Sequence, residues 1–273
     1  MNKYIFIDID GTLFSTVING VPNSALEAIK LARNNGHKVY LCTGRALPEC
    51  KVYLNLDVDG FIFSAGSIVY SNTKKIYEKP FDIEFIDKVM NTSDKLNVGY
   101  VIGGNAGAYA NDIGYKEITK YFAKNENDPI KIREILMNNG VFDIKDKHPL
   151  DYINKICIYA NSLDDIKQLE NILGDSIYFA LSHNDGEHYF GDIIRKDINK
   201  FTGIQEVLKV ENVDIENTMC IGDSNNDIDM LKGCHIGIAM GNAYENVKEY
   251  ADYVTDDILE DGIYNAFKKY NLI

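Results

Sequence analysis

Residues 4–12 read Tyr-Ile-Phe-Ile-Asp-Ile-Asp-Gly-Thr, and this segment gives the strongest indication of the fold. Four consecutive apolar residues are typical of a strand that is buried on both faces in a parallel sheet. The carboxylates of Asp8 and Asp10 follow where the strand ends, and Gly11 permits a sharp turn of the backbone there. Open α/β sheets place their ligands at this carboxyl edge. The stretch therefore predicts a buried strand that delivers two carboxylates to a ligand site.

Two carboxylates two residues apart can divide the work of a phosphoryl transfer. One can attack phosphorus as a covalent nucleophile, and the other can protonate a leaving oxygen and later activate water. The plainer interpretation of Asp8 and Asp10 is an acidic surface turn, because Asp and Gly are frequent in turns. A calcium loop of the EF-hand type is excluded, because it needs Glu at its twelfth position, which is Asn19 when the count starts at Asp8.

Strand-like and helix-like segments alternate near both ends of the chain. The expected strands are 3–8, 39–42, 61–63, 219–221 and 236–239. The expected helices are 24–35, a second helix after Arg45, 201–210, a helix containing 228–231, and 259–270. Ser24 and Glu27 form the residue pair of a capping box, and Gly36 is expected to end the first helix. This alternation predicts an α/β fold with a doubly wound parallel sheet.

The middle of the chain has a different pattern. Its strand-like runs are 98–102, 156–160 and 177–181, and its helical stretches are 83–96, 130–138 and 163–173. We expect residues 82–190 to form a separate α+β domain, inserted into a core built from residues 1–81 and 191–273. We interpret Gly103-Gly104-Asn105-Ala106-Gly107 as a hairpin turn, with a ligand-contacting loop as the alternative.

The charge and composition of the chain indicate which kinds of binding partner it can have. The chain has 273 residues, with 28 Lys and Arg against 41 Asp and Glu, and a formal net charge of −13. Such an acidic surface repels nucleic acid and anionic lipid, so we expect neither nucleic acid nor a membrane as a partner. The five cysteines form no Cys-x-x-Cys pair, and we find no signal peptide and no apolar run of membrane-span length. We expect a cytoplasmic protein with reduced cysteines.

A second acidic cluster, Gly222-Asp223-Ser224-Asn225-Asn226-Asp227, follows the expected strand at 219–221. If the next helix starts early, Asp223 and Asp227 share its first face, because residues four apart are neighbours on a helix. A few carboxylates, together with water and a substrate phosphate, are what Mg²⁺ binds in such sites. A plain helix cap is the alternative, because Ser, Asn and Asp are favoured there. The cluster by itself leaves both interpretations open.

Two weaker signals lie at other strand and helix ends. Thr43-Gly44-Arg45 follows the strand at 39–42, where a hydroxyl and backbone N–H groups can hold phosphate oxygens. Lys200 opens the helix at 201–210, where it could pair with a nucleophilic carboxylate and a phosphate. Taken alone, the first is more simply an ordinary turn and the second a solvated lysine. Lys196 competes with Lys200 for the role.

Taken in chain order, these segments resemble the four motifs of the haloacid dehalogenase superfamily. The segments are Asp8-x-Asp10-Gly11-Thr12, Thr43-Gly44-Arg45, Lys200 and Gly222-Asp223-x-x-Asn226-Asp227. The chain is most similar to the Cof-type branch, which carries an inserted α+β cap of type C2B. Residues 239–243, 251–255 and 260–262 also resemble Cof-type segments. Two departures are Ala65-Gly66, where the family often has Asn-Gly, and Lys200-Phe201, where it often has Lys-Gly.

The resemblance implies a Mg²⁺-dependent phosphatase that hydrolyses a small phosphorylated metabolite, such as a sugar phosphate, through an aspartyl-phosphate intermediate. It implies that Asp8 is the nucleophile and Asp10 the general acid and base. The residues implied to hold the phosphate are Thr43, Gly44, Lys200 and Asn226. The implied Mg²⁺ ligands are Asp8, Asp10 through its backbone carbonyl, Asp223 and Asp227.

Two other functions stay open at this point. A sugar phosphomutase with the same core and cap must grip a second phosphate, which favours arginines in the cap. Between residues 81 and 190 the sequence contains one arginine, Arg133, which disfavours a mutase. A non-catalytic binding or regulatory protein of this fold would be expected to lose Asp8 or Asp10, and both are present. The substrate and the oligomeric state are not predicted.

Overall fold

The computed structural model describes residues 2–50, 52–146, 150, 152–184 and 188–273. The chain forms two compact units, which are described separately. Unit 1 comprises Met1–Arg45, Cys50–Glu78 and Ile198–Ile273, and unit 2 comprises Ala46–Glu49 and Lys79–Asp197. The segment 82–190, expected to form an inserted domain, lies within unit 2. That this unit acts as a cap remains a prediction.

Unit 1 is built on one eight-stranded sheet. Its strands are β1 (Tyr4–Asp8), β2 (Lys38–Cys42), β3 (Gly60–Phe63), β4 (Ile68–Ser71), β5 (Lys74–Glu78), β12 (Thr218–Gly222), β13 (Ile236–Ala239) and β14 (Tyr253–Val254). Its α-helices are α1 (Asn23–Asn34), α6 (Lys200–Glu211), α7 (Ile228–Gly233), α8 (Glu245–Lys248) and α9 (Gly262–Lys269). Short 3₁₀ helices lie at Ser64–Gly66, Ile215–Asn217 and Asn225–Asp227.

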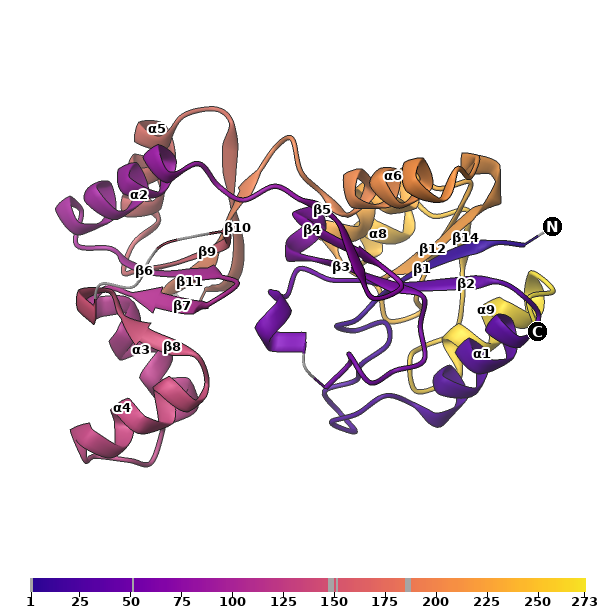
Figure 1. Ribbon diagram of the computed structural model, residues 1–273, viewed down its shortest axis with the longest axis horizontal. Helices are drawn as coiled ribbons and strands as arrows, with labels where there is room; N and C mark the ends of the chain where they lie inside the picture. The colour runs from indigo at the N-terminus through magenta and orange to yellow at the C-terminus, as the bar shows by residue number, and fades with distance from the viewer. Residues whose placement is uncertain (1, 51, 147–149, 151, 185–187) are drawn as a thin grey trace. The chain divides into compact units, whose positions relative to one another are not determined.

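The strand order in this sheet is β14-β13-β12-β1-β2-β3-β4-β5. The strands from β14 to β3 pair in parallel, and β4 and β5 extend the sheet as antiparallel strands. Figure 1 shows α6 and α8 on one side of the sheet and α1 and α9 on the other. The predicted α/β fold with a doubly wound sheet is therefore confirmed. The antiparallel pair at its edge was not foreseen.

Three local expectations are wrong. The first helix begins at Asn23, with Pro22 as its N-cap residue, so Ser24 lies inside the helix and makes no capping bond. After Arg45, Leu47–Cys50 forms a 3₁₀ helix rather than an α-helix, and the Glu49 carboxylate accepts the Ala46 N–H at its start. The last helix starts at Gly262 rather than at 259, because Asp261 has left-handed backbone angles (φ 61°).

Unit 2 is a six-stranded sheet with four α-helices among its described residues. Its strands are β6 (Gly99–Gly104), β7 (Gly107–Ala110), β8 (Val141–Asp143), β9 (Ile153–Ala160), β10 (Ile177–Asn184) and β11 (Tyr189–Arg195). Its α-helices are α2 (Ile83–Lys95), α3 (Asp112–Phe122), α4 (Pro129–Asn138) and α5 (Leu163–Leu173). The strand order is β10-β11-β9-β6-β7-β8.

The core of unit 2 lies between this sheet and two of its helices. Ile86 and Val89 of α2 and Leu169 of α5 pack with Ile156 and Ile158 of β9 in one buried cluster. Figure 1 shows α3 and α4 on the opposite side of the sheet from α2 and α5. Of these elements, the sequence pattern missed β7, β8, β11 and α3. Residues 103–107 form the β6–β7 hairpin, as interpreted from the sequence.

Two further findings concern cysteines and membranes. None of the five cysteines, all of which lie in the described part of the chain, forms a disulfide bond, and four of them are buried: Cys42, Cys50, Cys220 and Cys234. Among the residues that the structure describes, no helix has the length and apolar character needed to cross a bilayer.

Candidate active site

Three neighbouring strand ends bring the candidate residues to one edge of the unit 1 sheet. Strand β1 lies between β2 and β12, and all three run parallel. Asp8 is the last residue of β1, Thr43 directly follows β2, and Asp223 directly follows β12. Because the carboxyl ends of parallel neighbours meet at the same edge, segments more than 200 residues apart become adjacent.

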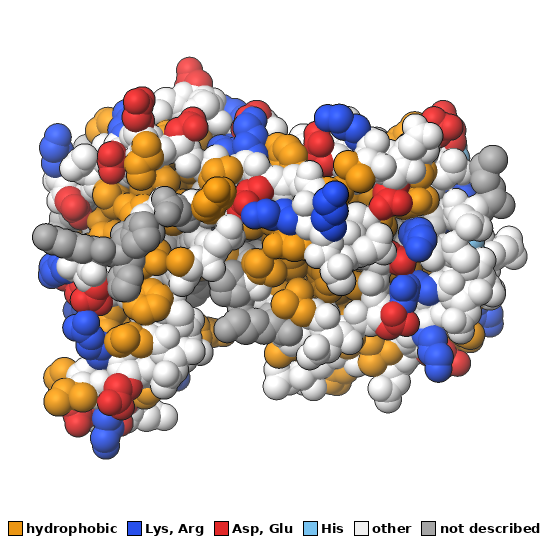
Figure 2. Space-filling view, viewed as in Figure 1, with side chains coloured by type: hydrophobic (Ala, Val, Ile, Leu, Met, Phe, Trp, Pro, Cys, Tyr) orange, Lys and Arg blue, Asp and Glu red, His pale blue; other side chains and the backbone are white. Residues whose placement is uncertain are grey.

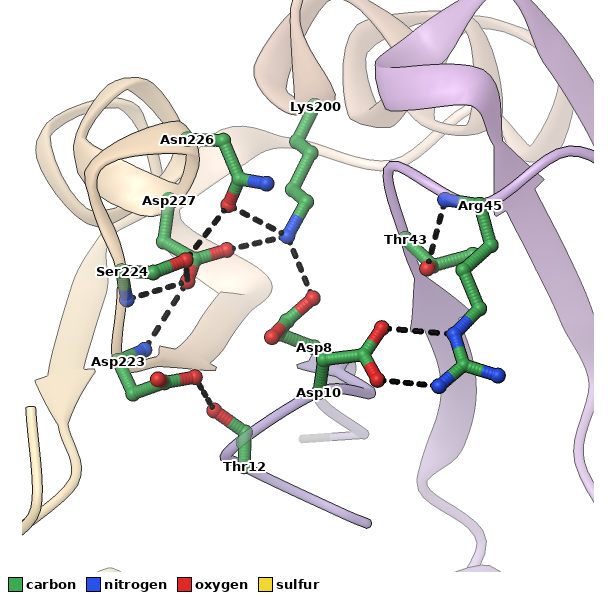
Figure 3. A network of polar contacts seen from close by, with 10 residues as sticks. All are labelled: Asp8, Asp10, Thr12, Thr43, Arg45, Lys200, Asp223, Ser224, Asn226 and Asp227. Atoms are coloured by element: carbon green, nitrogen blue, oxygen red, sulfur yellow. Dashed lines mark hydrogen bonds and ion pairs between the residues drawn. The ribbon is translucent and has the colours of Figure 1, made fainter. Parts of the chain in front are cut away.

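Lys200 is the centre of a buried polar network. It is the first residue of α6, which Asn199 caps by accepting the Thr202 N–H, and its side chain is fully buried. Its ammonium nitrogen lies 2.5 Å from Asp8 Oδ1, 2.5 Å from Asp227 Oδ1 and 3.0 Å from Asn226 Oδ1. Figure 3 shows these side chains converging from separate parts of the chain. The competitor Lys196 is exposed and belongs to unit 2.

Asp227 organises the loop that carries Asp223. Its Oδ2 accepts the backbone N–H groups of Asp223 at 2.9 Å and Ser224 at 3.0 Å, while its Oδ1 accepts from Lys200. The expectation that Asp223 and Asp227 share the first face of a helix is wrong. Asp223 precedes the 3₁₀ turn at Asn225–Asp227, and α7 starts only at Ile228. The two acids meet because the loop folds back onto the Asp227 carboxylate.

The turn after β1 holds Asp223 in place. Gly11 has a φ of +83°, and a Cβ atom there would lie 2.3 Å from Asp223 Oδ2, so a larger residue cannot fit without displacing that carboxylate. Thr12 donates its hydroxyl to Asp223 Oδ1 at 2.8 Å. The sequence predicts no separate role for Thr12. Its position next to Gly11 places it in the turn, but its contact with Asp223 arises only when residues 12 and 223 meet in the fold.

The acidic cluster fits a divalent cation. Asp8, Asp223 and Asp227 each offer a carboxylate oxygen within 4.8 Å of the others. The ammonium group of Lys200 bonds to Asp8 and Asp227, and Asp223 lies beside them without an ion pair to Lys200, so one positive charge faces three carboxylates in a poorly solvated place. Hard oxygen ligands of this kind suit Mg²⁺. Asp227 already accepts several hydrogen bonds, which favours a supporting role for it.

The pKa values report the same excess of negative charge. Burial raises the pKa of Asp8 well above its usual range, and repulsion from Asp227 adds to this, while Lys200 opposes it. Burial also raises the pKa of Asp223 to about 6, against the hydrogen bond from Thr12. Burial alone would lower the pKa of Lys200, but Asp227 and Asp8 outweigh it and raise that pKa. A cation beside Asp8 and Asp223 would relieve this repulsion.

Asp10 turns its side chain away from this cluster. Its half-exposed carboxylate accepts the Nε–H of Arg45 at 2.8 Å and a second bond from Nη2 of the same guanidinium. Figure 3 places Asp10 and Arg45 on the far side of Asp8 from Asp223. Only the backbone carbonyl of Asp10 was expected to bind metal, and that expectation remains a prediction.

Thr43 and Gly44 lie beside Arg45 rather than inside the acidic cluster. Thr43 is buried, and its hydroxyl accepts the Arg45 backbone N–H at 3.0 Å. Gly44 approaches Asn226, whose Nδ2 would lie 3.5 Å from a Cβ at that glycine. The structure therefore places both predicted phosphate-binding residues at the same sheet edge as Asp8. Arg45 belongs to the same sequence segment, but no role was predicted for it.

The match to a family model covers almost the whole chain. The model, described as haloacid dehalogenase-like hydrolase, matches residues 5–267. The chain belongs to this family. A curated relative, the 5-amino-6-(5-phospho-D-ribitylamino)uracil phosphatase YcsE of Bacillus subtilis (strain 168), is 28% identical, with 99% of this chain and 96% of the relative covered.

Solved structures of haloacid dehalogenase-like phosphatases are similar over the whole chain. BT1666 from Bacteroides thetaiotaomicron is 26% identical with a TM-score of 0.80, covering 100% of this chain and 96% of that one. The subclass IIB sugar phosphatase BT4131 is 26% identical with a TM-score of 0.76, covering 100% of both chains. The predictions of a Cof-type family member and of a phosphoric monoester hydrolase are confirmed. A phosphorylated small molecule is accordingly its class of substrate.

Proposed function

We propose that this haloacid dehalogenase-like phosphatase is Mg²⁺-dependent and that it hydrolyses its substrate through a phosphate ester of Asp8. The observation that carries the proposal is the contact set of Asp8. It ends β1 almost fully buried, one of its oxygens bonded to Lys200 and another carboxylate, Asp223, beside it. A buried carboxylate held by an ammonium group at a cation site is suited to attack phosphorus.

The first half of the reaction transfers the phosphoryl group to Asp8. An Asp8 oxygen forms a bond to phosphorus, and the bond from phosphorus to the leaving oxygen breaks with its electron pair on that oxygen. Asp10 supplies the proton that the leaving oxygen takes up. Lys200 and Asn226, with Thr43 and Gly44 on the other side, stabilise the charge on the phosphoryl oxygens.

The second half returns Asp8 to its starting state. Asp10, now ionised, accepts a proton from a water molecule as that water forms a bond to phosphorus and the bond to Asp8 breaks. Inorganic phosphate leaves. Because Asp10 lies two residues from Asp8 on the same turn, one carboxyl group can serve both steps.

Mg²⁺ would be held by Asp8, Asp223 and the backbone carbonyl of Asp10, with Asp227 supporting the loop and Lys200. When bound, it supplies positive charge that offsets the repulsion between the carboxylate nucleophile and the phosphate dianion. The fit rests on the three carboxylate oxygens within 4.8 Å of one another and on the raised pKa values of Asp8 and Asp223.

We propose a phosphorylated sugar or sugar alcohol as the substrate. The relatives support this class, since one is named for a phosphorylated ribityl compound and another as a sugar phosphatase. No observation favours a phosphomutase. Arg133, the arginine that could grip a second phosphate in residues 81–190, is exposed and ion-paired with Asp146 at 2.9 Å.

A phosphate-release screen tests the proposal. Purified protein is assayed with sugar phosphates, sugar-alcohol phosphates, nucleotides and pyridoxal phosphate, with Mg²⁺ and with EDTA. We expect release that requires Mg²⁺ and is highest among the sugar and sugar-alcohol phosphates. Asp8→Asn should lose activity by about four orders of magnitude or more, as for other essential nucleophiles. Substantial Mg²⁺-dependent release by Asp8→Asn would rule out the aspartyl-phosphate route.

A further inference from the structure

The Asp10–Arg45 ion pair is placed where it adds little to folding. The Asp10 side chain is 50% exposed and that of Arg45 is 31% exposed. Ion pairs as exposed as this contribute little to stability, because water screens them and two long side chains lose freedom. In the contacts of the described residues, the Asp10 carboxylate bonds to Arg45 alone, and it does so through both oxygens. Stabilisation of the fold therefore does not account for the two-bond contact between Asp10 and Arg45.

The Arg45 side chain is itself held by two aromatic rings. Its guanidinium carbon lies 5.8 Å from the centre of the Phe14 ring and 5.6 Å from that of Tyr53. The two rings meet edge to face, 6.2 Å apart, and Tyr53 is almost fully buried. Stacking on such rings restricts a guanidinium group. Arg45 thus presents its two N–H donors from a defined position.

Phe14 and Arg45 belong to the two turns that also carry Asp10 and Thr43. Phe14 belongs to the turn after β1, since its carbonyl accepts the Gly11 N–H at 3.0 Å and it pairs with Asp10 in an isolated bridge. Arg45 follows Thr43, and the Thr43 hydroxyl accepts its backbone N–H. The turn that carries the general acid is therefore tied to the turn that carries Thr43 (Figure 3).

We propose that Arg45 is a positioning residue for the proton-transfer steps: it holds the ionised Asp10 carboxylate through both oxygens and the protonated Asp10 through the oxygen that carries no proton, so that the carboxyl group is oriented beside the scissile bond. The inference rests on the proposed function, in which Asp10 protonates the leaving oxygen as the phosphorus–oxygen bond breaks and the Asp8–phosphorus bond forms. A half-exposed carboxyl group would otherwise sample several rotamers, and proton transfer requires it within hydrogen-bond reach of the leaving oxygen. Arg45 acts through Asp10 and does not itself exchange the proton.

The test compares two aryl phosphates of similar shape with leaving groups of different basicity. p-Nitrophenyl phosphate releases a weakly basic phenolate that leaves without a proton, whereas phenyl phosphate releases a more basic one that needs protonation. General acid catalysis contributes roughly 10²–10⁴-fold where it is needed. The comparison is made on the first turnover, which reports transfer of the phosphoryl group to Asp8 and excludes the later hydrolysis step that both substrates share. We expect Arg45→Met to lower the first-turnover rate of phenol release from phenyl phosphate at least about tenfold more than that of p-nitrophenol release from p-nitrophenyl phosphate, with Arg45→Lys intermediate.

A double-mutant cycle separates this role from phosphate binding. In an Asp10→Ala background, Arg45→Met should change the first-turnover rate for phenyl phosphate by no more than about twofold, because residues acting as one unit are not additive. Equal losses in the first turnover of both aryl phosphates, or an undiminished effect in the Asp10→Ala background, would overturn the inference. Retained first-turnover release of p-nitrophenol, which needs no proton from Asp10, shows that a variant is folded. Failure of the wild-type protein to release phosphate from either probe would instead overturn the proposed function on which the inference rests.

Discussion

Replacing the nucleophile Asp8 by Asn should abolish turnover and yet stabilise the metal-free protein. Asp8 is buried, and burial and Asp227 raise its pKa well above the usual range, so its ionised form is unfavourable in the folded state. Asn keeps the shape and an oxygen that can accept from Lys200, but it removes the charge. The variant therefore removes the unfavourable burial and repulsion of the Asp8 charge, which destabilise the metal-free enzyme.

The magnitude follows from the charges around Asp8. The carboxylate oxygens lie within 4.8 Å of one another, and each pair repels by at least about 3–4 kcal/mol at an effective dielectric constant of about 20, so Asp223 and Asp227 together oppose Asp8 by roughly 7 kcal/mol or more. Lys200, 2.5 Å away, attracts it by about the same amount. The pair terms nearly cancel, and the desolvation of a buried ion, several kcal/mol, remains. We expect a gain of about 1–3 kcal/mol after repacking of the site.

Thermal unfolding in EDTA and in saturating Mg²⁺ measures this effect. In EDTA the Tm of Asp8→Asn should exceed that of the wild type by roughly 2–12 °C, at about 2–4 °C per kcal/mol for a chain of this size. Mg²⁺ should raise the Tm of the wild type more than that of the variant. Asp10→Asn is the matched control, since its exposed pair with Arg45 should change stability by at most about 1 kcal/mol. An Asp8→Asn variant less stable than the wild type in EDTA would refute the charge argument.

Three other perturbations test the same site. Lys200→Met leaves two buried carboxylates without their ammonium partner and should cost about 3–5 kcal/mol in denaturant unfolding, whereas the exposed Lys196→Met should cost under about 0.5 kcal/mol. The pKa of Asp223, raised to about 6, means that the folded state binds a proton more tightly than the unfolded chain. The stability of the metal-free protein should therefore rise as pH falls from 7 through 6. The rise in Tm caused by Mg²⁺ should become smaller over the same range, because protonation of Asp223 competes with the metal. An equal Mg²⁺-induced rise in Tm at pH 5 and pH 7.5 would contradict this. Gly11→Ala should displace Asp223 and weaken Mg²⁺ binding about tenfold or more by calorimetry, while Gly103→Ala, with its nearest neighbour at 3.6 Å, serves as the tolerated control.

The parallel part of the fold could be read from local patterns. The strands at Tyr4–Asp8 and Thr218–Gly222 each contain a short uninterrupted apolar run, and each run is soon followed by an acidic residue, Asp8 in the first case and Asp223 in the second. A continuous apolar run indicates a strand that is buried on both faces, because side chains on each face then contact the core. The antiparallel pair β4 and β5 was missed because Lys74–Glu78 is mostly polar and half-buried at the sheet edge. An edge strand with one solvated face carries a weaker signal.

The ends of helices were harder to predict from the sequence than the positions of strands. Leu259 to Asp261 had the composition of a helix start, yet the left-handed angles of Asp261 delay α9 to Gly262. In the same way, the spacing of Asp223 and Asp227 suggested a shared helix face, whereas the Asp227 carboxylate instead accepts two backbone N–H groups of its own loop. A side chain that bonds to nearby backbone competes with the helix, and spacing alone does not show which partner it takes.

The chemical groups of the site, and the strand ends that carry them, can be predicted from local sequence, because residue type and apolar pattern are local properties. The burial of Lys200, 192 residues from Asp8 along the chain, between Asp8 and Asp227 follows from the folded arrangement. The same is true of the contact between Asp10 and Arg45, which turns the Asp10 side chain away from the acidic cluster. Charge, burial and pKa depend on which groups meet in space, and those meetings are made by the pairing of β1 with β2 and β12, which local sequence does not encode.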